Sequence, residues 1–353
     1  KNHVLEFAGP GVSGLSMDYR IGIDVMTTET ACLSSIWQTD GKVEEYLALR
    51  GRGEEYRKLE PQEGAFYDDM ITIDLSSVES MIALPFHPSE AYSIHEFQAN
   101  AGDILRETEK RLEQQLEGKS VDLASKLKDG KLMIDQGVIA GCAGGMFENI
   151  AEAASILHGH SVGNGYFNLS VYPPSVPVNV ELINKGIQQD LMLSGALFKS
   201  CFCGPCFGAG DVPGNGALSI RHTTRNFPNR EGSKPGEGQI SGVMLMDARS
   251  IAATARNKGQ LTAACRCFRY GGGVAFLCDF GRCFNDSCDS AFTRNFRFGF
   301  NNGGCSNCLK AHAHSETKGK NDCHKFFCVC CHIFPPLSKN LMKKVKFRRP
   351  GSP

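Results

Sequence analysis

The stretch Gly137-Val138-Ile139-Ala140-Gly141-Cys142-Ala143-Gly144-Gly145 has the pattern of a buried strand followed by a tight turn. Residues 146–157, which come next, repeat apolar side chains at the period of an amphipathic helix. A strand–turn–helix unit predicts a parallel sheet, because parallel strands need a crossover connection. Cys142 follows the strand directly, so we expect it at the carboxyl edge of that sheet. In open α/β sheets that edge is where ligands bind.

The same unit repeats downstream of this stretch. Strands are predicted at 166–172 and 196–199, with helices between them at 178–185 and 187–192. Strands at 217–221 and 243–246 follow, and Asp247 caps a helix over 248–257 that ends at Gly259. The alternation predicts an α/β fold, a doubly wound three-layer αβα sandwich. We expect α/β domains at 1–130 and 131–264 and a tail at 265–353.

The region before residue 131 has weaker patterns. Residues 20–25 alternate as a short strand, and Thr27 or Thr28 can cap a helix that runs on to residue 37. Glu29 would then lie in the first turn, where a carboxylate favours the positive end of the helix dipole. Its alternative role is that of a simple charge at a helix start. Further helices are predicted near 43–50 and 95–115.

A second thiol site, Cys203-Gly204-Pro205-Cys206, follows the strand predicted at 196–199. In thioredoxin-type oxidoreductases such a pair is followed directly by a helix, which lowers the pKa of the first thiol. Here residues 207–216 hold four glycines and a proline, which disfavour a helix. A glycine-rich loop instead suits an iron–sulfur cluster, because backbone N–H groups can approach the cluster closely. Two buried cysteines that bind nothing are a further alternative.

Three cysteines therefore meet at one sheet edge, together with two arginines that follow the next strand, Arg225 and Arg230. A [4Fe–4S] cluster with three cysteine ligands keeps one iron open as a Lewis acid. Guanidinium groups beside it would bind carboxylates in bidentate fashion. Each arginine alone would be interpreted as a solvated surface charge.

In these residues the chain resembles the aconitase family of iron–sulfur hydro-lyases. The matching segments occur in family order over about residues 4–264 and are Glu6-Phe7, Gly9-Pro10-Gly11-Val12, Glu29, Tyr67-Asp68, Gly141-Cys142, Cys203-Gly204-Pro205-Cys206, Gly208, Arg225-Asn226-Phe227 and Arg230. The resemblance implies that Cys142, Cys203 and Cys206 ligate a [4Fe–4S] cluster. It also implies that Glu29 lies near the labile iron and that Arg225 and Arg230 bind substrate carboxylates.

The reaction that this resemblance implies is the reversible dehydration of a hydroxy-polycarboxylic acid such as citrate or isocitrate, as in the tricarboxylic acid cycle. The sequence departs from the family at three points: Ala143-Gly144-Gly145 replaces Thr-Asn-Ser, Thr224 stands where Asn is usual, and Val25, four residues before Glu29, stands where another Asn is expected. Such changes around a cluster favour a substrate other than citrate. We expect the family's Asp-Ser-His-Thr segment to precede residue 1 and its serine-bearing domain to follow the body. We therefore expect cluster binding with poor turnover.

Composition changes sharply after Ala264. Residues 265–353 hold 15 Lys and Arg against 5 Asp and Glu, and 11 of the 16 cysteines, although the whole chain is formally neutral. We expect a frame-shifted, mis-joined or disordered tail. The alternative function is a zinc- or nucleic-acid-binding module in this segment.

The remaining body is acidic, which argues against nucleic acid as a partner. No apolar run reaches the roughly 20 residues of a membrane span, and no secretory signal opens the chain. We expect a cytoplasmic monomer that binds a small polycarboxylate.

Overall fold

The structure is a computed structural model, and it describes residues 2–116, 118, 121–228 and 240–264. Arg230 and the tail at 265–353 lie outside this part of the chain. The zinc, nucleic-acid and frame-shift interpretations of the tail lie outside it as well, because all of their residues belong to that segment.

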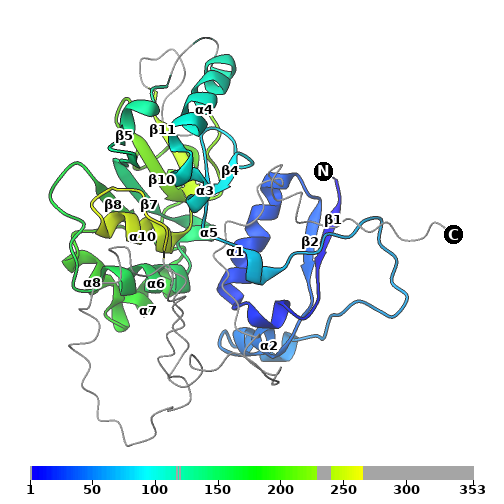
Figure 1. Cartoon of the computed structure of the whole chain (residues 1–353). Coiled ribbons are helices and arrows are strands. Elements are labelled where there is room, and N and C mark those ends of the chain that lie inside the picture. The colour runs from blue at the N-terminus through cyan, green and yellow to red at the C-terminus, as the bar shows by residue number, and fades with distance from the viewer. Residues whose placement is uncertain (1, 117, 119–120, 229–239, 265–353) are drawn as a thin grey trace, which may run out of the picture. The chain divides into compact units, whose positions relative to one another are not determined.

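A seven-stranded sheet of order β4-β3-β11-β10-β7-β8-β9 forms the centre of the described chain (Figure 1). Its strands are β3 (Met81–Ala83), β4 (Ala91–Ser93), β7 (Gln136–Ile139), β8 (Asn168–Val171), β9 (Leu197–Phe198), β10 (Leu218–His222) and β11 (Gly242–Met246). The strands from β11 to β9 in this order pair in parallel, whereas β3 runs antiparallel to both β11 and β4. The sheet thus joins strands from both sides of residue 130, where the sequence analysis placed a boundary.

Helices alternate with these strands along the chain, as predicted. They are α3 (Ile94–Ala99), α4 (Ala101–Gln115), α5 (Gly141–Gly144), α6 (Phe147–Leu157), α7 (Val176–Asn184), α8 (Ile187–Leu193), α9 (Gly204–Phe207) and α10 (Ala248–Arg256). Helix α10 packs against α6 and against β7 and β10. Gly186, with φ of +71°, separates α7 from α8, and the Asp247 side chain caps α10 by accepting from the Ser250 N–H. The predicted α/β fold is confirmed.

The two faces of the sheet bury different chemistry. Side chains alternate along a strand, so Leu218 and Ile220 of β10 join the main hydrophobic core, with Ile150 and Ile251 from the helices. Ser219 and Arg221 lie on the opposite face, yet every residue of β10 is buried. One face is therefore an apolar core, and the other holds buried polar groups at the strands that lead to the thiols.

The first 80 residues form a separate two-stranded parallel sheet, β1 (Val4–Phe7) and β2 (Ser34–Trp37), with helices α1 (Met17–Thr27) and α2 (Gly41–Ala48) (Figure 1). A short antiparallel pair, β5 (Leu127–Lys128) and β6 (Lys131–Leu132), follows α4. The 3-10 helices are at Val12–Gly14, Thr28–Thr30, Gly53–Glu55, Leu75–Ser77 and Ala124–Lys126.

Two predictions in this region are wrong. The strand predicted at 20–25 is part of α1, which Ser16 caps by accepting from the Tyr19 N–H and which buries Arg20, Ile23 and Met26 at helical spacing. The helix predicted up to residue 37 is a 3-10 turn at Thr28–Thr30 followed by strand β2. Ala31, with φ of +58°, ends the turn and redirects the chain into the strand.

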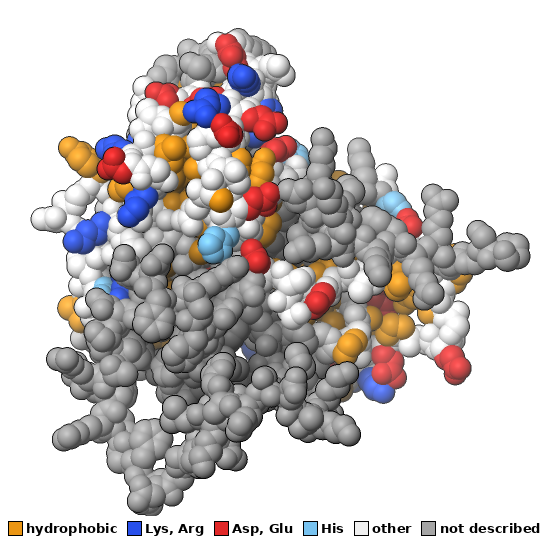
Figure 2. Space-filling model, in the orientation of Figure 1, with side chains coloured by type: hydrophobic (Ala, Val, Ile, Leu, Met, Phe, Trp, Pro, Cys, Tyr) orange, Lys and Arg blue, Asp and Glu red, His pale blue; other side chains and the backbone are white. Residues whose placement is uncertain are grey.

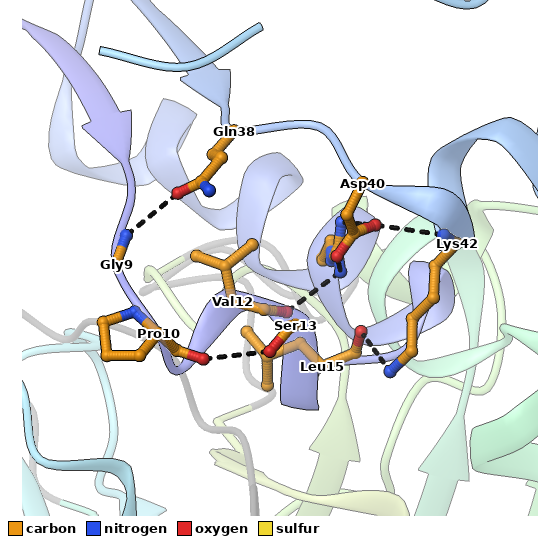
Figure 3. Close-up of polar contacts among 9 residues, drawn as sticks. Gly9, Pro10, Val12, Ser13, Leu15, Gln38, Asp40 and Lys42 are labelled. Atoms are coloured by element: carbon orange, nitrogen blue, oxygen red, sulfur yellow. Dashed lines mark hydrogen bonds and ion pairs between the residues drawn. The ribbon is translucent and has the colours of Figure 1, made fainter. Parts of the chain in front are cut away.

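A buried ion pair ties α1 to the start of α2. The Arg20 side chain is 2% exposed, and its Nη1 and Nη2 donate to the two Asp40 oxygens at 3.0 and 2.6 Å. Arg20 also donates to the Val12 carbonyl. Figure 3 shows the neighbouring contacts of the segment between β1 and α1. Among them, Gln38 accepts from the Gly9 N–H, and Lys42 Nζ donates to the Leu15 carbonyl at 3.2 Å. The Gly9–Val12 segment is thus fixed between β1 and α1.

The surface of the described residues is mixed in charge. Figure 2 shows acidic and basic side chains interspersed over the α4 region, with hydrophobic side chains between them. A search of the described residues for a helix with the length and hydrophobicity of a membrane span finds none.

We predict that Asp40→Asn destabilises the fold in a pH-dependent way. Burial alone would raise the pKa of Asp40, but the Arg20 hydrogen bonds and charge lower it below its ordinary value of 3.8. A carboxyl with a lowered folded pKa stabilises the fold above its unfolded pKa and loses that effect as the pH falls through the folded value. Denaturant unfolding at pH 7 should show that the free energy of unfolding falls by about 1–3 kcal/mol. This difference from the parent should become smaller below about pH 4.

Asp103→Asn is the control, because its pair with Arg106 is largely exposed. It should change the free energy of unfolding by less than about 0.5 kcal/mol. An Asp40→Asn loss that is equally large at pH 7 and pH 3 would show that the ion pair is not its cause.

Candidate functional site

Cys142 lies on a turn that is pressed against the ends of two neighbouring strands. The turn follows β7, begins at Gly141 with φ of +73° and continues as the single helical turn α5. A Cβ atom at Gly144 would lie 2.0 Å from the His222 carbonyl oxygen at the end of β10. One at Gly145 would lie 2.4 Å from the carbonyl oxygen of Tyr172, just after β8. Position 144 therefore requires glycine, and the Asn that the aconitase family usually has there does not fit this backbone.

The second thiol site is the segment 201–211, which we call the cysteine loop. It follows β9 and contains the one-turn helix α9, with Cys203 at its N-cap and Gly208 in the left-handed region at its end. The sequence predicts no helix here, and the structure departs from this prediction by one helical turn. The Cys206 N–H closes the turn by donating to the Cys203 carbonyl at 3.1 Å. The turn is too short to supply the extended helix that the oxidoreductase alternative requires.

The structure brings the three predicted thiols together. The Cβ position of Gly141 lies 3.8 Å from Cys203 Sγ, so the turn of Cys142 contacts the cysteine loop. Desolvation first, and then the charges of Cys203 and Cys206, raise the pKa of Cys142. Desolvation and the Cys206 charge likewise raise the pKa of Cys203. Thiolates that destabilise one another in this way are stabilised by a bound cation.

Polar side chains surround these sulfurs. Thr224 Oγ1 and Cys206 Sγ are 3.0 Å apart, so the residue that stands where Asn is usual still contacts a thiol. Arg225 follows β10 at the same sheet edge, and its charge opposes the rise in the pKa of Cys203. Cys32 hydrogen bonds with Thr30 at 2.8 Å, and it is not among the cysteines whose charges raise the pKa of Cys142.

Two predicted site residues that are far apart in the sequence form an ion pair. Arg225 Nε donates to Glu29 Oε1 at 2.7 Å, and the side chains of Arg225 and Glu29 are 38% and 7% exposed. The Glu29 hydrogen bond and charge raise the pKa of Arg225. Glu29 therefore fixes the guanidinium beside the thiols, whereas Arg230 lies outside the described residues.

Sequence reasoning missed the buried polar groups beneath the cysteine loop. Arg221 is 1% exposed and donates to the Pro205 carbonyl within the loop. Asp211, at the end of the loop, accepts from Lys199 Nζ at 2.6 Å and from Ser170 Oγ at 3.0 Å. The available signal was a basic residue at the end of the strand predicted at 217–221, on the same face as the polar Ser219.

The three thiols are the groups at this site that could hold a cofactor. In the described part of the chain, no three His, Cys, Asp or Glu side chains are grouped as ligands of one metal ion. The charges of Cys203 and Cys206 nevertheless raise the pKa of Cys142, so the three thiols lie within electrostatic range of one another. Thiolates are also the ligands that iron–sulfur clusters use.

Comparisons with known proteins show the family of the chain. A model of the aconitase family (aconitate hydratase) matches residues 1–253. The chain belongs to the aconitase family. Its similarity to the 3-isopropylmalate dehydratase large subunit of Clostridium beijerinckii is 29% identity over 259 residues, which cover 73% of this chain and 52% of that protein.

A second aconitase-family relative is the 2,3-dimethylmalate dehydratase large subunit of Eubacterium barkeri, with 28% identity over 248 residues. That alignment covers 70% of this chain and 51% of the relative. The chain thus spans about half the length of the curated relatives that it matches. The predicted family membership is confirmed.

We predict that Gly144→Ala disrupts the turn that carries Cys142. The added methyl group would overlap the backbone of His222, which cannot move without shifting the end of β10. Overpacking of this kind costs about 1–3 kcal/mol, measurable by denaturant unfolding. Gly165→Ala is the control, because its Cβ would meet nothing within 4 Å. Equal stability of the two variants would contradict the backbone contact.

Proposed function

We propose that this chain is the cluster-binding part of an iron–sulfur hydro-lyase that dehydrates and rehydrates a hydroxy acid with two or more carboxylates. The observation that carries the proposal is the placement of the Arg225–Glu29 ion pair beside three thiols on one sheet edge. An anion-binding group next to a thiol-lined metal site matches what such a reaction needs.

Each part of the site has a distinct role in this proposal. Cys142, Cys203 and Cys206 would hold a [4Fe–4S] cluster, which supplies an iron without a protein ligand as a Lewis acid for the substrate hydroxyl. Arg225 uses Nε for Glu29, so its two terminal NH2 groups can bind a carboxylate as a fork. Glu29 holds that fork in place. Its nearly buried carboxylate can also accept a proton.

The relatives suggest the substrate class. The two described above are named for 3-isopropylmalate and 2,3-dimethylmalate, which are branched hydroxy-dicarboxylic acids. We therefore propose a substrate of this kind in place of citrate or isocitrate, and no role in the tricarboxylic acid cycle. The departures at Gly144 and Thr224 are in line with this choice. Arg230 is proposed as a second carboxylate-binding residue on the family resemblance alone.

The relatives also suggest a partner. Each is named a large subunit, which implies a second subunit. We propose that the protein works with a small subunit, and the expectation of a monomer finds no support in these names. A cytoplasmic location stays a prediction.

Anaerobic reconstitution of the chain with iron and sulfide tests this proposal. We predict cluster-level iron and sulfide in the parent, and less than a tenth of that content in a triple Cys142→Ser, Cys203→Ser, Cys206→Ser variant. Cys32→Ser is the control and should keep the parent's content, because Cys32 is not one of the three proposed ligands and hydrogen bonds with Thr30 instead. Equal iron in the triple variant and the parent would overturn the assignment of the ligands.

A binding experiment tests the substrate class. We predict that added 3-isopropylmalate changes the electron paramagnetic resonance spectrum of the reduced, loaded chain. Arg225→Gln should weaken this binding roughly 10- to 100-fold, because a hydrogen bond to a charged group contributes about 1.5–3 kcal/mol. Arg256→Gln, at the end of α10, should leave the affinity unchanged. A response to citrate but none to 3-isopropylmalate would contradict the proposed substrate.

A further inference from the structure

The side chain of Arg221 is an unusual component of a sheet interior. It lies near the end of β10 and is 1% exposed. Among the described residues, it is the largest of the fully buried side chains. Burying a guanidinium group is costly unless its donors are paired. An apolar side chain of similar volume would fill the same space at lower cost. Packing alone therefore does not explain why a charged side chain occupies this position.

The hydrogen bonds of Arg221 point to that purpose. Nη1 donates to the Pro205 carbonyl at 2.5 Å, and Nη2 donates to the Asp211 carbonyl at 2.7 Å. These two acceptors flank Cys206 in the cysteine loop, one directly before it and the other at the end of the loop. One planar guanidinium thus fixes two points of the loop backbone, which a flexible ammonium group cannot do in the same way.

The other end of Arg221 is anchored to the sheet. Nε donates to Ser219 Oγ at 3.1 Å on the same strand, and Ser219 Oγ in turn donates to Gln136 Oε1 at 2.8 Å on β7. Gln136 Oε1 also lies 3.4 Å from Arg221 Nη2. Strand β7 is the strand that leads to Cys142, so the network connects both thiol sites through the sheet.

The Asp211 carboxylate forms an ion pair with Lys199 at the end of the cysteine loop. Burial alone would raise the pKa of Asp211, but hydrogen bonds from Lys199, Tyr172 and Ser170 lower it. The carboxyl is therefore ionised at neutral pH, next to the carbonyl that Arg221 binds. Lys199 follows β9 directly, so the start of the cysteine loop is tied to its end.

We propose that Arg221 is a positioning residue that holds the cysteine loop in the conformation that presents Cys203 and Cys206 to a cluster. It acts through the Pro205 and Asp211 carbonyls. The inference deepens the proposed function and rests on it only for the identity of the cluster. The conformation of the loop is a property of the metal-free chain.

Hydrogen exchange of the metal-free full chain, followed by mass spectrometry, tests the proposal directly. We expect Arg221→Met to speed exchange at the loop amides of Cys206 and Ala209, which donate within the loop, at least tenfold. Amides of α6 and α10 should exchange as in the parent. Arg221→Lys, which keeps the charge but cannot span both carbonyls, should give an intermediate rate.

Arg20→Met is the matched control. Arg20 is also a buried arginine, but it binds the Asp40 carboxylate and the Val12 carbonyl, which are not part of the cysteine loop. It should lower the melting temperature without speeding exchange in the cysteine loop. Unchanged loop exchange in both Arg221 variants would overturn the proposal, and so would equal acceleration in Arg20→Met. If Arg221→Met does not fold, Arg221→Lys is judged by the same two criteria.

Reconstitution with iron and sulfide separates this proposal from the proposed function. We expect Arg221→Met to retain less than half of the parent's iron and Arg20→Met to retain all of it. A parent chain that binds no iron would refute the proposed function, while the exchange data would still decide the role of Arg221. Full iron with an unaltered electron paramagnetic resonance spectrum in Arg221→Met would refute the role of Arg221 alone.

Discussion

The close contact between the turn after β7 and the end of β10 is the constraint on which the site depends. Gly144 has no side chain, so its backbone can lie directly against the His222 carbonyl. This contact sets Cys142 beside the strand that continues into Thr224 and Arg225. Because β7, β9 and β10 are parallel members of one sheet, their carboxyl ends share an edge. The thiols and the arginine that follow these strands therefore meet at that edge.

Charge then organises what the sheet brings together. Burial and the charges of neighbouring thiols raise the pKa values of Cys142 and Cys203. Arg221 lies beneath the cysteine loop and Arg225 beside the sulfurs, so positive groups flank a site that becomes negative when the thiols ionise. Arg225 forms an ion pair with the Glu29 carboxylate, and Arg221 binds the backbone carbonyl of Asp211. The site can thus hold several thiolates and an anionic ligand in a small volume.

The sheet and the thiol positions could be predicted from the sequence because their signals are local. The strand–turn–helix stretch around Cys142 carries its period, its glycines and its helix within about twenty residues, and the same holds for α10 with its Asp247 cap. The pattern at 20–25 failed for the opposite reason. Its alternation imitates a strand, but the Ser16 cap and the burial of Arg20 against Asp40 favour a helix.

Other features depend on contacts that no local pattern encodes. The ion pair of Glu29 joins residues 196 positions apart, although the resemblance to the aconitase family placed both residues near one site. The role of Arg221 depends on two backbone carbonyls of a loop. Every residue type has the same backbone carbonyl, so the sequence does not show which ones Arg221 binds. The visible sign in the sequence is a basic residue at the end of a strand, and it does not identify the groups that this residue binds.

Mössbauer spectroscopy of the iron-loaded chain tests the central claim most directly, namely that three cysteines hold a cluster with one iron open to a hydroxy acid. The account predicts that one iron of four differs from the others and that its signal shifts when a branched hydroxy-dicarboxylate is added. Four irons that respond alike, or iron without the signal of a cluster, would contradict it.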